Sequence, residues 1–191
     1  MPTPTEVTDS QGQVAPQASS LFANTWDLRF KIGVSRRYSS RLEGHYSSLD
    51  NVSTVAVLVG GSTALADVIG KGTSIAVYAT LVVVVLTSLS LAFRWGDKAR
   101  LHGGLYRQYT RLQERLDRAG GHLTEETFNE IKADYVMVEA EEPTIRTALI
   151  AICHNEEVEA QGHPKTEKIS LRFWQRWFAR FGTLPPYTWE K

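Results

Sequence analysis

Hydrophobic residues gather in one long stretch between Asp50 and Arg94, which only two charged residues, Asp67 and Lys71, interrupt. Its second half, residues 72–93, is uncharged for 22 residues, eleven of which are Val, Leu, Ile or Phe. As a helix this half is about 33 Å long, enough to cross a hydrocarbon core of about 30 Å. The pattern therefore predicts a transmembrane helix over residues 72–93.

The first half of the stretch, residues 51–70, gives a weaker signal, because its uncharged part ends at Ala66 and contains two adjacent glycines. Taken alone, it is also compatible with a buried helix of a soluble protein. A hairpin that turns at Gly70-Lys71-Gly72 places the basic flanks on one side of the membrane. Those flanks contain Arg29, Lys31, Arg36, Arg37 and Arg41 before the stretch, and Arg94, Lys98, Arg100 and Arg107 after it. The positive-inside rule then predicts two spans, about 51–70 and 72–93, with both termini cytoplasmic.

Apolar residues outside the hairpin recur at helical spacing and predict four cytoplasmic amphipathic helices. The first, about 22–48, carries its apolar face on Trp26, Phe30, Val34 (or Ile32) and Tyr38. The other three cover about 97–119, 124–139 and 143–160. We expect an all-α membrane protein with a domain over residues 21–160, preceded by a disordered tail over residues 1–20.

Local signals refine these three helices. Leu101, Leu105, Tyr109, Leu112 and Leu116 form a stripe typical of an amphipathic helix that pairs in a short coiled coil. Thr124 is the predicted N-cap of the next helix, whose apolar face is Phe128, Ile131, Tyr135 and Val138, and Pro143 is the predicted first residue of the last one. Residues 125–159 hold ten acids, which we interpret as a solvated face.

The C-terminal segment, residues 161–191, places arginines and aromatic residues on neighbouring sides of a helix. The members of this set are Arg172, Phe173, Trp174, Arg176, Trp177, Phe178, Arg180 and Phe181. Such a helix suits the headgroup region of a membrane, and packing against the protein's own helices is an equal alternative.

Composition and motifs point away from catalysis. The 21 basic residues balance 21 acidic ones, so charge does not suggest a nucleic-acid partner, and one cysteine excludes a disulfide framework. Gly70-Lys71-Gly72-Thr73 is not a Walker A motif, because Leu65 and Gly72 stand where glycine and Ser/Thr are needed. Cys153, His154 and His163 lack the spacing of a metal site or a nucleophile pair. We expect no enzyme activity, no cofactor and no metal.

Small and polar residues share one face of each predicted span, as helix packing in a bilayer requires. The candidates for helix packing or for lining a pore are Ser53, Ala56, Gly60, Thr63, Ala64 and Asp67 in the first span and Thr73, Ala76, Thr80 and Thr87 in the second. These faces suit a hairpin packed on itself or several hairpins around an axis. Asp67 would pair with Lys71 at the interface or line a pore mouth.

This layout resembles the SLATT family, the SMODS and SLOG-associating two-transmembrane effector domains of bacterial conflict systems. The matching segments are RFKIGVSRRYSSRLEGHYSSLD before the spans, DKARLHGGLYRQYTRLQERL after them, and TEETFNEIKADYVMVEAEEPTI with its following helix. The resemblance covers roughly residues 26–159. It implies a multi-pass protein of the bacterial inner membrane that oligomerises and permeabilises the bilayer when a separate nucleotide-linked sensor is triggered. It supplies no catalytic residues.

Two other interpretations remain. A non-pore scaffold would use the hairpin to tether the helical cytoplasmic part beside a partner protein. A holin-like protein would also make holes, although holins are generally smaller outside the membrane than this chain, half of which is cytoplasmic in the predicted topology.

Overall fold

The computed structural model describes residues 14–69 and 74–179, and within them the chain is helical with no strand. Side chains are described except at residues 14–19, 63–69, 74–76, 79, 165 and 178. The elements are α1 (Val14–Ile69), α2 (Ser74–Phe93), α3 (Trp95–Ala119), η1 (Gly120–His122), α4 (Glu125–Ala140), α5 (Thr147–Ala160), η2 (Lys165–Glu167) and α6 (Phe173–Phe178). The predicted all-α class is confirmed for this part of the chain.

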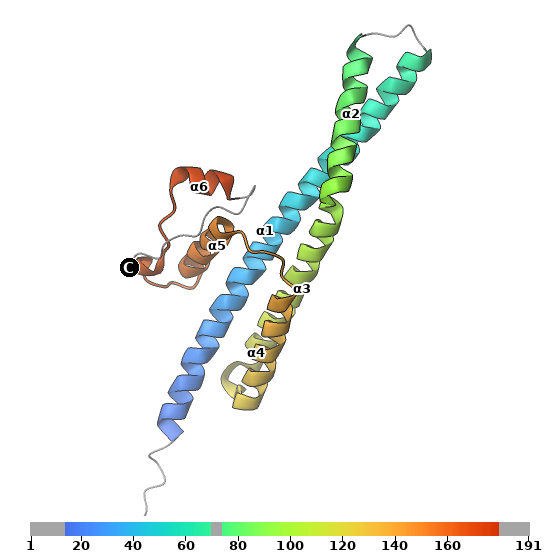
Figure 1. The fold of residues 1–191 in the computed structure, drawn as a ribbon. Helices are drawn as coiled ribbons and strands as arrows, with labels where there is room; N and C mark the ends of the chain where they lie inside the picture. Colours follow the sequence, from blue (N-terminus) through green and yellow to red (C-terminus); the bar gives the residue numbers. More distant parts are fainter. Residues whose placement is uncertain (1–13, 70–73, 180–191) are drawn as a thin grey trace, which may run out of the picture.

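One helix, α1, organises the molecule. Its 56 residues extend for about 84 Å, and α2 and α3 run antiparallel to it one after the other (Figure 1). α2 therefore pairs with the C-terminal part of α1, and α3 with the part before it. α4 folds back along α3, whereas α5 lies beside α1 and α6 contacts α5 (Figure 1). Residues 51–69 together with α2 form the hairpin, and the rest of the described chain forms the base.

The continuity of α1 corrects two predicted boundaries. The helix predicted over 22–48 and the span predicted over 51–70 are one helix, because no glycine or proline lies near Asp50 to end it. α1 also begins at Val14, inside the segment predicted to be a disordered tail. Extending a helix that packing already stabilises costs little, which explains the earlier start. Residues 1–13 lie outside the described chain.

The base has a first hydrophobic core between α1, α3 and α4. Leu28 and Ile32 of α1 meet the stripe predicted on α3 and the apolar face predicted on α4. The buried members are Leu28, Ile32, Leu105, Tyr109, Leu112, Leu116, Phe128, Ile131, Tyr135 and Val138. The stripe thus packs within its own chain, and Leu101, which was predicted to share it, is exposed. Thr124 caps α4 as predicted, since its side chain accepts a hydrogen bond from the backbone N–H of Thr127 at 3.2 Å.

A second core joins α1 to α5, and its buried members include Val34, Tyr38, Leu42, Tyr46, Leu149 and Cys153. α5 begins at Thr147, so the prediction that Pro143 is its first residue is wrong. The Tyr38 hydroxyl accepts a hydrogen bond from the backbone N–H of Arg146 at 2.9 Å, and the Arg146 guanidinium donates to the Tyr46 hydroxyl at 2.6 Å. These contacts with α1 hold Arg146 as the N-cap, which delays the helix by four residues.

Candidate membrane-spanning hairpin

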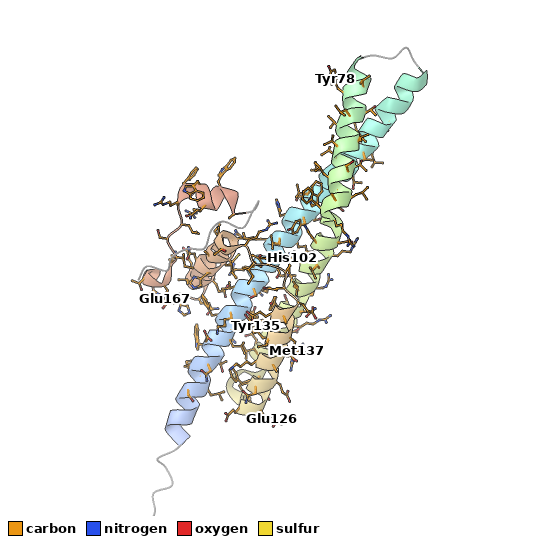
Figure 2. The ribbon with its side chains drawn as sticks, viewed as in Figure 1. Tyr78, His102, Glu126, Tyr135, Met137 and Glu167 are labelled. Atoms are coloured by element: carbon orange, nitrogen blue, oxygen red, sulfur yellow. The ribbon has the colours of Figure 1, made fainter. Side chains whose placement is uncertain are left out.

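The outer surface of the hairpin is made of large apolar side chains. Figure 2 shows them projecting from both helices, with Tyr78 near the tip. Most of these side chains are at least half exposed: Val52, Val55, Leu58, Val59, Val77, Tyr78, Leu81, Val82, Val84, Val85, Leu89, Leu91 and Phe93. Contiguous exposed apolar surface of this extent marks a contact with lipid or with another protein.

The inner surface of the hairpin carries small and polar residues, as the helical spacing predicts. Ser53 is 4% exposed and Gly60 is buried, whereas Ala56 and Thr87 are half-buried. The Ser53 hydroxyl lies 3.4 Å from the Ser90 hydroxyl and bonds to it across the two helices. Part of the predicted small face therefore packs the hairpin on itself.

The other predicted packing residues fall outside this contact or outside the described side chains. Thr80 is exposed. Four residues lie within the helices but have no described side chain, namely Thr63, Ala64, Asp67 and Ala76. The turn Gly70-Lys71-Gly72 and Thr73 lie outside the described residues. The predicted pairing of Asp67 with Lys71 therefore stays a prediction.

Hydroxyl groups in the hairpin bond to the backbone of their own helix. Ser62 donates to the Leu58 carbonyl at 2.7 Å, Thr87 to the Val83 carbonyl at 2.8 Å, and Ser88 to the Val84 carbonyl at 2.8 Å. An unbonded hydroxyl is costly to transfer into hydrocarbon, whereas one that bonds a carbonyl one turn earlier is not. These residues are thus compatible with a lipid environment despite their polarity.

A bend separates α2 from α3 at Arg94, which adopts a left-handed backbone with φ 49° and ψ 51°. Arg94 and Arg100 both pair with the Asp97 carboxylate at 2.5 Å, and these guanidinium groups lower the pKa of Asp97. The Phe93 and Trp95 rings stack across the bend with centroids 6.2 Å apart. Charged and aromatic residues therefore collect at the point where the apolar surface ends, as they do at membrane interfaces.

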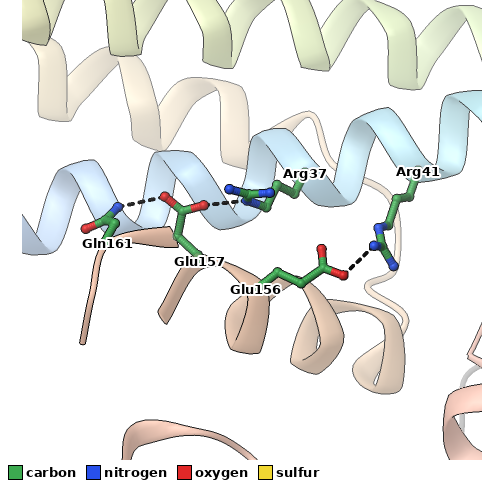
Figure 3. Close-up of polar contacts among 5 residues, drawn as sticks. All are labelled: Arg37, Arg41, Glu156, Glu157 and Gln161. Carbon is green, nitrogen blue, oxygen red and sulfur yellow. Dashed lines mark hydrogen bonds and ion pairs between the residues drawn. The ribbon is translucent and has the colours of Figure 1, made fainter. Parts of the chain in front are cut away.

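α5 meets α1 through ion pairs that the sequence did not reveal, and one of their carboxylates is buried. Arg37 pairs with Glu157 at 2.5 Å and Arg41 with Glu156 at 2.5 Å, and the Gln161 amide donates to Glu157 at 2.7 Å (Figure 3). We predicted that the ten acids of residues 125–159 form a solvated face. Glu157 is only 5% exposed, so this prediction is wrong at that residue. The reason is the two arginines, which lie one turn apart on α1 and face α5.

Gly33 makes room for this contact. A Cβ atom at position 33 would lie 2.3 Å from a Glu157 carboxylate oxygen, so the Glu157 side chain would have to move away from α1 to admit one. The absence of a side chain at Gly33 thus allows α5 to bring its carboxylate against α1. A similar close approach places the Glu43 carboxylate of α1 against Gly103 of α3. The Gly103-Gly104 pair does not interrupt α3, which is continuous through it.

Groups that could support other chemistry do not assemble in the described residues. No cluster of His, Cys, Asp and Glu in this part of the chain could hold a metal ion. Cys153 is fully buried in the core, and burial raises the pKa of its thiol to about 12. Its thiol is therefore protonated at neutral pH and inaccessible to a substrate.

The predicted interfacial residues lie in or next to α6, which is only six residues long. Arg172 precedes this helix, and Phe173, Trp174, Arg176 and Trp177 are exposed on it. The Phe178 side chain, Arg180 and Phe181 are not among the described groups.

No family model, curated protein or solved structure matches this chain. Among the described residues, no single helix meets both the length and the apolarity needed to cross a membrane. The segments Thr80–Phe93 and Trp95–His122, bent by 41° at their junction, meet these criteria only as a pair. α2 is described with all its side chains only from Thr80 onward.

Proposed function

We propose that this chain is a bacterial inner-membrane effector whose hairpin crosses the bilayer twice, with the base on the cytoplasmic side. The observation that carries the proposal is the apolar exterior of the hairpin, which has no covering element among the described residues. Burying Val or Leu side chains stabilises a protein by about 1.5 to 3 kcal/mol each, so exposing so many to water is unfavourable. Lipid would remove this cost.

The sequence of α2 supports insertion quantitatively. Ser74–Phe93 contains 20 residues and is about 30 Å long as a helix, close to the thickness of a hydrocarbon core. Its apolar residues favour insertion by roughly 0.3 to 0.6 kcal/mol each near the bilayer centre. The hydroxyl groups add little cost, because several bond to their own backbone.

The proposed activity is permeabilisation of the membrane by an oligomer, triggered by a separate nucleotide-linked sensor. It follows the resemblance to the SLATT family, and residues such as Thr80, exposed on the hairpin, are available for contacts between copies. On this proposal the protein needs no cofactor, and its partners are the bilayer, further copies of the chain and the sensor.

A specific observation favours a second candidate, the membrane scaffold. Ser53 and Gly60 are buried within a single hairpin, which leaves mainly bulky apolar residues on its outer surface. A hairpin of this kind can tether the base at the membrane without opening a pore.

Expression in bacteria with a dye that reports membrane potential tests the proposal. We expect rapid depolarisation from the native chain and none from Gly60→Leu, because leucine at this buried position separates α1 from α2. A matched control is Val59→Leu, since Val59 is 60% exposed and tolerates a larger side chain. Carbonate extraction shows whether each variant stays in the membrane.

Replacement of both spans by an unrelated two-helix hairpin distinguishes the candidates. A pore-forming effector loses its activity in this chimera, whereas a tether keeps its cellular function and never depolarises cells. If the native chain is removed from membranes by carbonate, both candidates are wrong.

A further inference from the structure

We infer that α6 docks through its aromatic face on an anionic lipid surface, the same bilayer surface that the hairpin enters. This inference rests on the proposed membrane insertion of the hairpin. It adds a second, peripheral contact with lipid, which would hold α5 and α6 against the headgroups.

The residues of α6 divide into two opposite faces. At 100° per residue, Phe173, Trp174 and Trp177 lie within about 100° of one another. Gln175 and Ala179 lie on the opposite side, and they are 8% and 0% exposed. Ala179 belongs to the core formed by α1 and α5. The polar and small side therefore packs inward, and the side that carries Phe173, Trp174 and Trp177 is exposed.

The exposure of the aromatic residues is high for a protein surface. Phe173 is 82% exposed, Trp177 is 67% exposed and Trp174 is 43% exposed. Trp and Phe next to arginine are the residues that settle at the headgroup level, where the ring is partly dehydrated and the guanidinium meets phosphate. A bilayer thus suits this face better than water does.

Charge on and around α6 selects an anionic surface. Arg172, which precedes α6, and Arg176, which is next to the aromatic face on the helix, are both exposed. The sequence has no acidic residue from Lys168 to Trp189, although acids are frequent in α4 and α5. Basic residues close to an anionic membrane attract it electrostatically, whereas acidic residues would oppose this.

The structure also fixes the orientation of this face. The Asn155 side chain of α5 accepts a hydrogen bond from the Ile169 backbone N–H at 2.6 Å and donates to the Ile169 carbonyl at 2.7 Å. The Gln175 side chain then accepts from the backbone N–H of Arg172 at 2.9 Å. These bonds tie the segment before α6 to α5, and α5 is paired with α1. In Figure 1, α6 lies beyond α5 in the direction of the hairpin.

Site-specific fluorescence in reconstituted vesicles tests the inference with the full chain. In a Cys153→Ala background, single cysteines replace Trp177, Val82 or Met137 and carry an environment-sensitive dye. Val82 reports the hairpin, and Met137, which is 70% exposed on α4, is the matched control for an exposed apolar residue of the base. The vesicles contain phosphatidylcholine with or without phosphatidylglycerol, and nitroxide lipids serve as quenchers.

We expect the dye at position 177 to be blue-shifted and quenched by nitroxides near the headgroups, more strongly with phosphatidylglycerol. The dye at position 82 should be quenched by deep nitroxides, and the dye at position 137 by neither. Arg172→Gln with Arg176→Gln should reduce quenching at position 177 and leave position 82 unchanged.

The outcomes separate this inference from the proposed function. If position 82 is quenched and position 177 behaves as position 137 does, α6 does not dock on lipid and the hairpin still inserts. If position 82 is not quenched by deep nitroxides, the insertion of the hairpin is itself refuted. A blue shift at position 177 without lipid quenching would show contact with protein and overturn the inference.

Discussion

α1 meets its antiparallel partners in two different ways along its length. In the base, Leu28 and Ile32 are at most 4% exposed, because α3 and α4 cover them. In the hairpin, Val52 and Leu58 are 63% and 65% exposed, because α2 is the only described helix beside them. A two-helix unit can bury only one side of each helix, so its remaining apolar surface needs another environment. One continuous helix can therefore contribute to a closed hydrophobic core in one part and to an exposed apolar surface in the next.

Truncating a leucine should give the largest difference in stability between the base and the hairpin. Leu105 is 1% exposed in the first hydrophobic core, and truncating a fully buried leucine leaves a cavity, so Leu105→Ala should reduce the free energy of unfolding by about 3 to 5 kcal/mol. Leu81 is 59% exposed, and Leu81→Ala should cost less than about 0.5 kcal/mol. Thermal unfolding in mild detergent, followed by circular dichroism, measures both. Equal losses at the two positions would show that the hairpin has a core of its own.

A charge placed on an exposed valine distinguishes lipid from water as the environment. Val84 in α2 and Val136 in α4 have nearly the same exposure, 55% and 53%. Val84→Arg should disfavour insertion by about 2.5 to 3.5 kcal/mol, on the order of a hundredfold in the membrane-inserted fraction. Val136→Arg should change nothing measurable, because water already surrounds it. Carbonate extraction quantifies the inserted fraction, and the same result for both variants would contradict the difference in environment.

How well a feature could be predicted depends on how far apart in the sequence the residues that determine it lie. Period and cap signals are local, so the core residues of α3 and α4 and the cap at Thr124 could be predicted. Contacts between distant residues could not, since nothing near Glu157 in the sequence indicates that Arg37 lies opposite it. The start of α5 was misplaced for the same reason, because its cap depends on Tyr38, more than a hundred residues away.

The hairpin was predictable in a different sense. Helical spacing indicated that Ser53, Ala56 and Gly60 share a face, and the structure places that face toward α2. The absence of a boundary near Asp50 was harder to foresee, because a helix passes from base to hairpin without a local signal. Near Asp50 only the composition changes, from a segment with many charged residues to one with almost none. Such a change indicates a different environment for the helix and does not indicate where the helix ends.

Acid should destabilise the base and spare the hairpin. His102 is 2% exposed, and burial lowers its pKa from 6.5 to about 4, with the nearby Arg146 charge adding to the effect. As the pH falls, the unfolded chain therefore takes up a proton at His102 before the folded chain does. The contribution of neutral His102 to stability is fully present above pH 6.5 and is lost as the pH falls toward 4. We expect unfolding of the base to cost about 2 kcal/mol less at pH 5 than at pH 7.5.

The variant His102→Phe isolates this contribution. Phenylalanine keeps a ring beside Tyr46, with which His102 stacks at 5.8 Å, but it cannot bind a proton. Chemical denaturation at the two pH values should show a smaller pH dependence for the variant than for the native chain. An unchanged pH dependence would assign the effect to other groups.

Two serines give the smallest effects, and they should have opposite signs in the two regions. Ser53 bonds to Ser90 across the hairpin, and hydrogen bonds between membrane helices contribute about 0.6 kcal/mol, so Ser53→Ala should destabilise by about that amount. Ser39 is fully buried in the base, and its hydroxyl has no hydrogen-bond partner among the described residues. Removing a buried hydroxyl that bonds nothing relieves a desolvation cost, so Ser39→Ala should leave stability unchanged or raise it by up to about 1 kcal/mol. Unfolding of both variants in the same detergent measures the difference, and a destabilised Ser39→Ala would mean that this hydroxyl has a partner in solution.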